Sequence, residues 1–205
     1  MSGDVIPVVI LVGGAGRRMG GVDKPLIPLG GRPLLRYVID ILAPQTKHIA
    51  LATRADPEPY RHFGLPLLPD TVADQGPLTG LRSALEWAKA TVPEASHVAL
   101  LAGDTPFIPS DLFARLGTAR SPTPSCIFAA SKGQIHYSTG LWPLSAHALL
   151  EADESDNNDR SLRGPAHHIG FETVEWTDEN DPFFNINSPD DLAEAELRVK
   201  RIKSA

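Results

Sequence analysis

Residues 8–12, VVILV, run directly into residues 13–25, GGAGRRMGGVDKP, and the fold prediction starts from this junction. The apolar run is typical of a strand buried in a parallel sheet. The segment after it holds five glycines, two arginines and one lysine. Glycines let backbone N–H groups approach an anion closely, and cations neutralise its charge. A helix starting just beyond would add a favourable field for negative charge. The stretch therefore predicts a buried strand followed by a polyphosphate-binding loop.

The spacing of this loop differs from two common phosphate-binding motifs. A Walker A motif has lysine directly after glycine and then Ser or Thr, whereas Lys24 follows Asp23 and precedes Pro25. A dinucleotide fingerprint has a third glycine where Met19 stands, and an acidic residue where the second strand here runs out into Arg54. An ordinary tight turn would explain the glycines but not the cations. The pattern favours a polyphosphate ligand and disfavours a dinucleotide-dependent oxidoreductase.

Composition limits the architecture and the partners. The chain has 205 residues, 42% of them hydrophobic and 21% charged, which suits one globular domain and is short for two. Its net charge of −6 argues against nucleic acid as the main partner. Since no apolar stretch approaches 18 residues, we expect no membrane span. The single cysteine, Cys126, fits a small buried residue in a cytoplasmic protein without disulfides.

Strand-like and helix-like segments alternate along the chain. This alternation predicts an α/β fold with one Rossmann-like, doubly wound, mostly parallel sheet and helices on both faces. We expect a single domain over residues 1–205, with a nucleotide-binding half at 1–117 and an acceptor-binding half at 118–205. Strands are expected at 8–12, 48–52, 65–68, 97–102, on both sides of 132–133 and at 172–177, and helices at 33–42, 77–88, 110–117, 146–150 and 188–202.

Polar residues follow the predicted strands, and ligands of such sheets bind beyond the carboxyl ends of the strands. Asp104 lies two residues after the apolar run 97–102, and Pro106 lies two residues after Asp104. A carboxylate among phosphates is explained by Mg²⁺, which bridges carboxylate and phosphate oxygens. Capping of a turn is the alternative role for Asp104. Asp70, after the third strand, by itself slightly favours a structural role in a routine Pro-Asp turn.

The first loop resembles the signature of a known family. Its pattern, LVGG-x3-RMGG-x-DK over residues 11–24, is similar to that of the molybdenum cofactor guanylyltransferases, which belong to the nucleotidyltransferases with a single Rossmann-like domain. Related sugar-phosphate and cytidylyl enzymes share the glycines, Arg-Met-Gly and lysine, whereas Gly21 and Asp23 favour the guanylyl branch. Residues 74–81, DQGPLTGL, and 185–192, NINSPDDL, resemble two further segments of that family.

This resemblance implies an enzyme that transfers GMP from GTP to the terminal phosphate of molybdenum-bearing molybdopterin and releases pyrophosphate. It implies Mg²⁺ as cofactor, GTP and molybdopterin as substrates, and transient contact with proteins that deliver or accept the cofactor. The implied catalytic residues are Arg18, Lys24 and Asp104, and Asp104 is the implied metal ligand. The implied acceptor-binding residues are Asn185 and Asn187. The implied nucleotide-binding residues are Leu11, Val12, Gly13, Gly14, Gly16, Arg18, Lys24, Asp70, Gly76, Gly80 and Asp104.

Some positions depart from the family pattern. The family often has asparagine at the end of the second strand, where Ala52 stands here, and its His-Pro segment near the acceptor is replaced by residues 136–140, HYSTG. A cluster formed by Arg160, Arg163, His167 and His168 is an alternative grip for an acceptor phosphate. Two other functions stay open from the residues: a cytidylyl- or sugar-phosphate nucleotidyltransferase of the same fold, and a non-catalytic GTP-binding protein.

Overall fold

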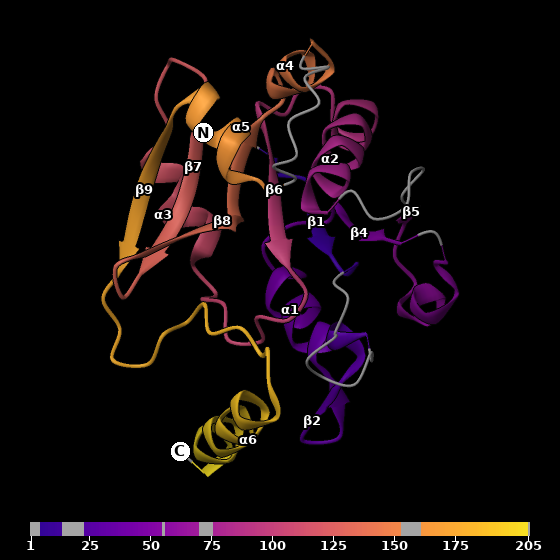
Figure 1. Cartoon of the computed structure of the whole chain (residues 1–205), viewed down its shortest axis with the longest axis vertical. Helices are drawn as coiled ribbons and strands as arrows, with labels where there is room; N and C mark the ends of the chain where they lie inside the picture. Colours follow the sequence, from indigo (N-terminus) through magenta and orange to yellow (C-terminus); the bar gives the residue numbers. More distant parts are fainter. Residues whose placement is uncertain (1–4, 14–22, 55, 70–75, 153–160, 205) are drawn as a thin grey trace.

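The computed structural model describes residues 5–13, 23–54, 56–69, 76–152 and 161–204. These residues form a seven-stranded sheet in the order β5-β4-β1-β6-β8-β7-β9 (Figure 1). All neighbouring pairs are parallel except those of β8, which runs antiparallel to β6 and β7. The predicted mostly parallel α/β fold is confirmed. The strands are β1 (Val8–Leu11), β4 (Ile49–Thr53), β5 (Leu67–Pro69), β6 (His97–Ala102), β7 (Cys126–Ser131), β8 (Gln134–Pro143) and β9 (Phe171–Trp176).

Helices cover both faces of this sheet because successive strand residues point to opposite sides. In β1, Val8 and Ile10 pack in one core with α1 and α3, whereas Val9 packs in a second core with α2, α4 and α5. The helices are α1 (Leu34–Leu42), α2 (Pro77–Thr91), α3 (Leu112–Thr118), α4 (Ala146–Ala152), α5 (Arg163–Ile169) and α6 (Pro189–Ser204). In the described part of the chain, no helix has the length and apolar character needed to cross a membrane.

The last helix, α6, covers neither face of the sheet but a separate small core. Its Ala195 and Val199 pack with Leu29 of the short hairpin β2 (Pro28–Leu29) and β3 (Arg32–Pro33). In Figure 1 the arrowheads of β6, β7 and β9 point toward the end of the molecule at which α6 lies. The chain therefore places a helix beyond the carboxyl ends of these strands, where ligands of such sheets bind.

The structure confirms one predicted turn and contains several short elements that the sequence did not predict. The turn between β7 and β8 is confirmed: Lys132 and Gly133 both have positive φ, of 50° and 76°, as a tight hairpin requires. The hairpin β2–β3 and the 3-10 helices η2 (Lys24–Leu26) and η3 (Glu58–Phe63) were not expected, because such short elements carry no periodicity. The helix α5 was also not expected, because Gly164 and Pro165 disfavour a helix by propensity.

Candidate active site

The ends of β1, β4 and β6 meet at one edge of the sheet. Leu11 is in register with Ala52 on one side and with Ala102 on the other. The ladder continues one step further, since Val12 N–H donates to Ala52 O at 3.0 Å and Gly103 N–H donates to Leu11 O at 3.0 Å. The glycine loop, which begins at residue 13, and the residues that follow β6 therefore start side by side, as the sequence predicts.

Lys24 and Asp104 meet at this edge. The Lys24 Nζ lies 3.7 Å from Asp104 Oδ2, and their side chains are only 17% and 19% exposed. Lys24 begins the 3-10 helix η2, and the next residue, Pro25, is buried. The close approach of Pro25 needs the absence of a side chain at Gly103, where an added Cβ would lie 3.2 Å from the proline ring. The packing of Pro25 against Gly103 therefore positions Lys24 beside the carboxylate of Asp104.

The electrostatics of Asp104 favour a bound cation. Burial raises the pKa of its carboxyl, and the nearby Lys24 ammonium acts in the opposite direction without cancelling this effect. The described residues contain no group of three or more His, Cys, Asp and Glu side chains that could hold a metal. A magnesium ion held by Asp104 would usually take further oxygens from phosphate and water.

The segment before α6 also reaches this edge. The Lys24 Nζ donates a 2.5 Å hydrogen bond to Asn187 Oδ1, and Ile186 N–H donates to Asp104 O at 3.1 Å. The Asn185 Oδ1 is buried and has no hydrogen-bond partner within the described structure. An orphaned buried oxygen needs a donor or a cation. The structure thus brings Asn187 to Lys24, and Asn185 precedes the residue whose amide bonds to Asp104.

The first turn of α6 fixes Asn187. Its N–H donates to Asp191 Oδ2 at 2.9 Å, and the Asp191 N–H donates to Ser188 Oγ at 3.2 Å. Burial acts to raise the pKa of Asp191, but hydrogen bonds to its carboxylate from Asn187 and Ser188, with the charge of Lys24, hold it below its usual value. Ser188 therefore caps α6. The same cap orients the residue that Lys24 contacts.

Tyr60 and Arg54 hold the start of the glycine loop; the sequence placed Arg54 at the end of the second strand but gave neither residue this role. The Tyr60 hydroxyl donates to Val12 O at 3.0 Å, and Arg54 Nε donates to Gly13 O at 2.8 Å. Burial raises the pKa of the Tyr60 phenol, and the carboxylate of Asp23 raises it further. Since Asp23 follows the loop in sequence, Tyr60 lies close to both of its stems. A lone tyrosine in a proline-rich segment gave no signal of this role.

Two other predicted nucleotide-binding residues, Gly76 and Gly80, lie at the start of α2. Gly76 has φ 69° at the N-cap of α2, and Gly80 lies in α2 against β1, where an added Cβ would come within 2.4 Å of Leu11 Cδ2. The structure thus gives Gly80 a packing role, and its contact with nucleotide stays a prediction. Gly14, Gly16, Arg18 and Asp70 lie outside the described residues, as does Arg160 of the alternative phosphate grip.

The remaining members of the alternative phosphate grip lie on α5. The His167 ring is 5.1 Å from that of Phe171, and the Tyr137 hydroxyl lies 3.3 Å from His167 Nε2. The role of this cluster as a phosphate grip stays a prediction.

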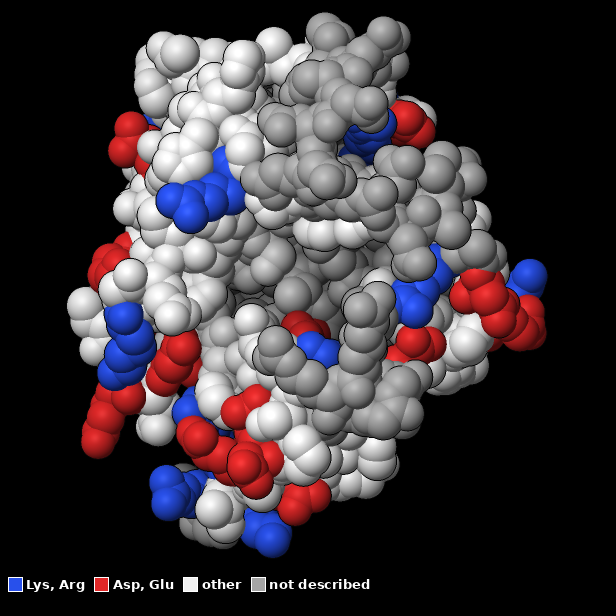
Figure 2. Space-filling model, viewed as in Figure 1, with Lys and Arg blue, Asp and Glu red and all other residues white. Residues whose placement is uncertain are grey.

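Figure 2 shows basic and acidic surface atoms next to each other at another place, at the lower edge of a hollow near the centre of the face.

Comparisons with known proteins agree with this geometry. Residues 8–169 match the family model described as the MobA-like NTP transferase domain. The chain is 42% identical to a molybdenum cofactor guanylyltransferase of Mesorhizobium japonicum, over 96% of this chain and 97% of that protein. It is 41% identical to a protein of the same name from Acidiphilium cryptum, over 95% and 96%.

A solved structure shows the same fold. The molybdopterin-guanine dinucleotide biosynthesis protein A of Archaeoglobus fulgidus superposes with a TM-score of 0.72 at 22% identity, over 96% of this chain and 100% of that one. Sequence identity, coverage and fold all agree. The chain therefore belongs to the MobA-like NTP transferase family, among the molybdenum cofactor guanylyltransferases.

Proposed function

We propose that this protein transfers GMP from GTP to the terminal phosphate of molybdopterin. The observation that carries the proposal is the convergence of Lys24, Asp104 and Asn187 at the sheet edge where the glycine loop begins. Lysine neutralises phosphate charge, and a half-buried carboxylate is the residue type that holds Mg²⁺ against a triphosphate. The names of the relatives support GTP as the nucleotide and molybdopterin as the acceptor.

In this reaction, a terminal phosphate oxygen of molybdopterin attacks the α-phosphorus of GTP in line. One P–O bond forms, the bond between the α-phosphorus and the bridging oxygen breaks, and pyrophosphate leaves with that oxygen. The product joins GMP to molybdopterin through a new diphosphate. The protein needs no covalent intermediate, because positioning and charge neutralisation supply most of the acceleration in phosphoryl-type transfer.

Each residue then has a definite task. Lys24 neutralises triphosphate charge and is oriented by its hydrogen bond to Asn187. Asp104 would hold the magnesium ion, which when bound neutralises charge on the phosphates as the transfer proceeds. Asn185 and Asn187 face the acceptor from the segment before α6. The backbone of the glycine loop and Arg18 cradle the phosphates of GTP.

The experiment is a substrate panel. The purified protein is incubated with Mg²⁺, each of GTP, CTP, ATP and UTP, and either molybdopterin or a sugar phosphate, and pyrophosphate is measured. We expect pyrophosphate chiefly from GTP with molybdopterin, and none from the Lys24→Ala variant on the same time scale. Faster release from CTP would indicate a cytidylyltransferase. GTP binding without pyrophosphate from any acceptor would indicate a non-catalytic GTP-binding protein.

A further inference from the structure

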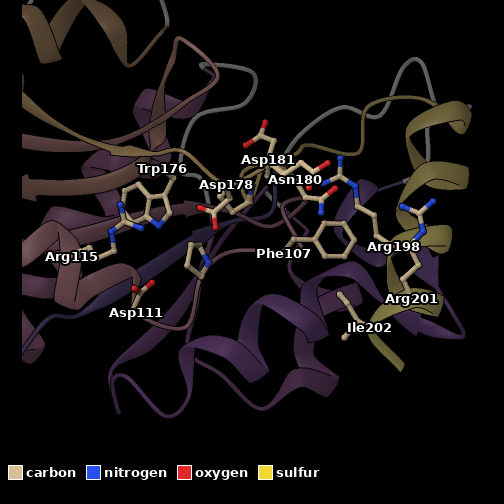
Figure 3. A pocket seen from close by; sticks show the side chains of 13 residues that line it. Phe107, Asp111, Arg115, Trp176, Asp178, Asn180, Asp181, Arg198, Arg201 and Ile202 are labelled. Atoms are coloured by element: carbon tan, nitrogen blue, oxygen red, sulfur yellow. Dashed lines mark hydrogen bonds between the residues drawn. The ribbon is translucent and has the colours of Figure 1, made fainter. Parts of the chain in front are cut away.

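The segment 177–188 connects the end of β9 to the two asparagines of the site, and one side of it borders a cavity. This cavity has a volume of about 470 Å³. Figure 3 shows Asp178, Asn180 and Asp181 of the segment along it, with Arg115 on one side and Arg198 on the other. Because a cavity offers few packing partners, the middle of the segment depends on polar contacts for its position.

A group of three polar side chains, one buried and two half-buried, supplies such contacts. Ser131, the last residue of β7, is 1% exposed, and its Oγ donates to Asp181 Oδ1 at 2.7 Å. The same Oγ lies 2.8 Å from Nε2 of His136 in β8. The Asp181 Oδ1 also accepts a hydrogen bond from Phe183 N–H at 2.9 Å. We call the group of Ser131, His136 and Asp181 the latch.

Proton counting fixes the direction of these bonds. A carboxylate only accepts, so the single hydroxyl proton of Ser131 goes to Asp181. The His136 Nε2 must then carry a proton and donate it to Ser131 Oγ. Burial lowers the pKa of His136, although Asp181 and Glu175 act to raise it. This direction excludes Ser131 as a nucleophile, because a histidine that donates to a serine cannot take its proton.

The chain leads directly from the latch into the site. Phe183 is buried, and its ring lies 5.1 Å from that of Trp176 at an interplanar angle of 89°. From the α6 side, Arg198 Nη1 donates to Asp181 O at 3.0 Å. Asn185 follows two residues after Phe183, and Ile186 N–H then bonds to Asp104 O. A shift at Asp181 is therefore passed along a few bonds to Asn185 and Asn187.

We propose that Ser131 and Asp181 are positioning residues for the acceptor substrate, because their hydrogen bond holds the segment that carries Asn185 and Asn187. This inference rests on the proposed function for the identity of the acceptor. The nucleotide is held from the other part of the edge, by β1, η2 and the glycine loop. Loss of the latch should therefore weaken acceptor use far more than GTP binding, which the segment reaches only through the hydrogen bond of Asn187 to Lys24.

The kinetic test compares two variants that lose the hydrogen bond between Ser131 and Asp181 with two variants that keep it. Ser131→Ala and Asp181→Ala remove the bond, whereas Asp181→Asn keeps an acceptor oxygen at the same place. Ser96→Ala is the matched control, because Ser96 Oγ also bonds a histidine, His97 Nδ1 at 2.8 Å, at the opposite end of β6. We expect KM for molybdopterin to rise about tenfold in the two alanine variants at Ser131 and Asp181. The Kd for GTP with Mg²⁺ should change by less than about twofold.

A second readout needs no substrate. Amide hydrogen exchange of wild type and Ser131→Ala, without ligands, reports whether Phe183, Ile186 and Asn187 lose protection. We expect faster exchange at these amides in Ser131→Ala and unchanged exchange there in Ser96→Ala. Unchanged protection, or an equal rise in KM for acceptor and nucleotide, would overturn the inference. A wild type without pyrophosphate release would overturn the proposed function alone, since the exchange experiment still tests the latch.

Discussion

The Lys24 ammonium stands 3.7 Å from the Asp104 carboxylate, which is an ion-pair distance but not a close hydrogen bond. The shorter contact of Lys24, at 2.5 Å, is to the neutral amide of Asn187. The carboxylate therefore keeps its oxygens available for another cation, while the ammonium is fixed in direction by an uncharged partner. Both groups are partly buried, so each remains an effective charge toward a bound polyphosphate.

We expect Lys24→Ala to lose turnover and keep its fold. Removal of one preorganised charge contact lowers the rate by about 10²–10³-fold. The measurement is kcat for pyrophosphate release from GTP and molybdopterin, with thermal unfolding as the check on folding. Lys89→Ala is the control, because Lys89 lies exposed near the end of α2 and away from the sheet edge. Equal activity of the two variants would remove Lys24 from the mechanism.

Asp104→Asn should be inactive and yet more stable than wild type near neutral pH. Because burial raises the pKa of Asp104, the folded state binds this proton more tightly than the unfolded state. Stability is then lost as pH rises through the folded pKa, and the neutral amide avoids that loss. Thermal melts of both proteins with a chelator check this. The variant's advantage should be present at about pH 8 and vanish below about pH 4, where the unfolded carboxyl is also protonated.

The opposite outcome for Asp104→Asn is equally informative. A variant less stable than wild type at about pH 8 would mean that the attraction of Lys24 outweighs the desolvation of the carboxylate. Near-normal turnover by the variant with Mg²⁺ would eliminate Asp104 as the metal ligand.

Tyr60→Phe should weaken GTP use by about tenfold in KM, because a hydrogen bond that holds the start of the glycine loop is lost while the ring packing stays. Tyr37→Phe is a closely matched control. The Tyr37 hydroxyl also donates to a backbone carbonyl, Leu29 O at 2.8 Å, but on the β2 hairpin. We expect similar small losses of stability in both variants and a raised GTP KM only in Tyr60→Phe. If Tyr37→Phe raised this KM equally, the effect would be general loosening.

Gly80→Ala and Gly117→Ala should change the free energy of unfolding in opposite directions. A Cβ at Gly80 would lie 2.4 Å from Leu11 Cδ2, so Leu11 or α2 must move, and such overpacking costs about 1–3 kcal/mol. A Cβ at Gly117 would meet nothing within 4 Å, and alanine in a helix gains about 0.4–1 kcal/mol. Urea unfolding measures both. Equal stability of the two variants would contradict the close approach of α2 to β1.

Much of the fold was predictable because long elements repeat their patterns. The buried run that becomes β6 and the spaced leucines of α2 each carry several residues of signal, and both elements lie where they were expected. Strands of two residues, and a short helix that contains Gly164 and Pro165, carry too little signal. The hairpin β2–β3 and the helix α5 form because they pack against the surrounding hydrophobic cores. Such tertiary packing cannot be predicted from a short stretch of sequence.

The site was predictable where a charged side chain closely follows a predicted strand or lies in the glycine-rich segment. Asp104 and Lys24 were singled out from the sequence, and the structure brings them together with Asn187. Tyr60, the bond of Asp191 to Asn187 and the latch of Ser131, His136 and Asp181 were not found, although the cap that contains Asp191 can be read from the sequence. They act through contacts to backbone groups or to each other across distant elements, and such contacts depend on the final geometry of the fold.

The late position of Asn187 in the chain has a consequence for biosynthesis. A nascent chain that has left the ribosome only as far as β9 already contains every strand of the described sheet, with Lys24 and Asp104, but lacks Asn187 and the α6 turn that orients it. The sheet can thus form during translation while Lys24 still has no amide partner at residue 187. The hydrogen bond that orients Lys24 therefore forms only after the segment before α6 has been added.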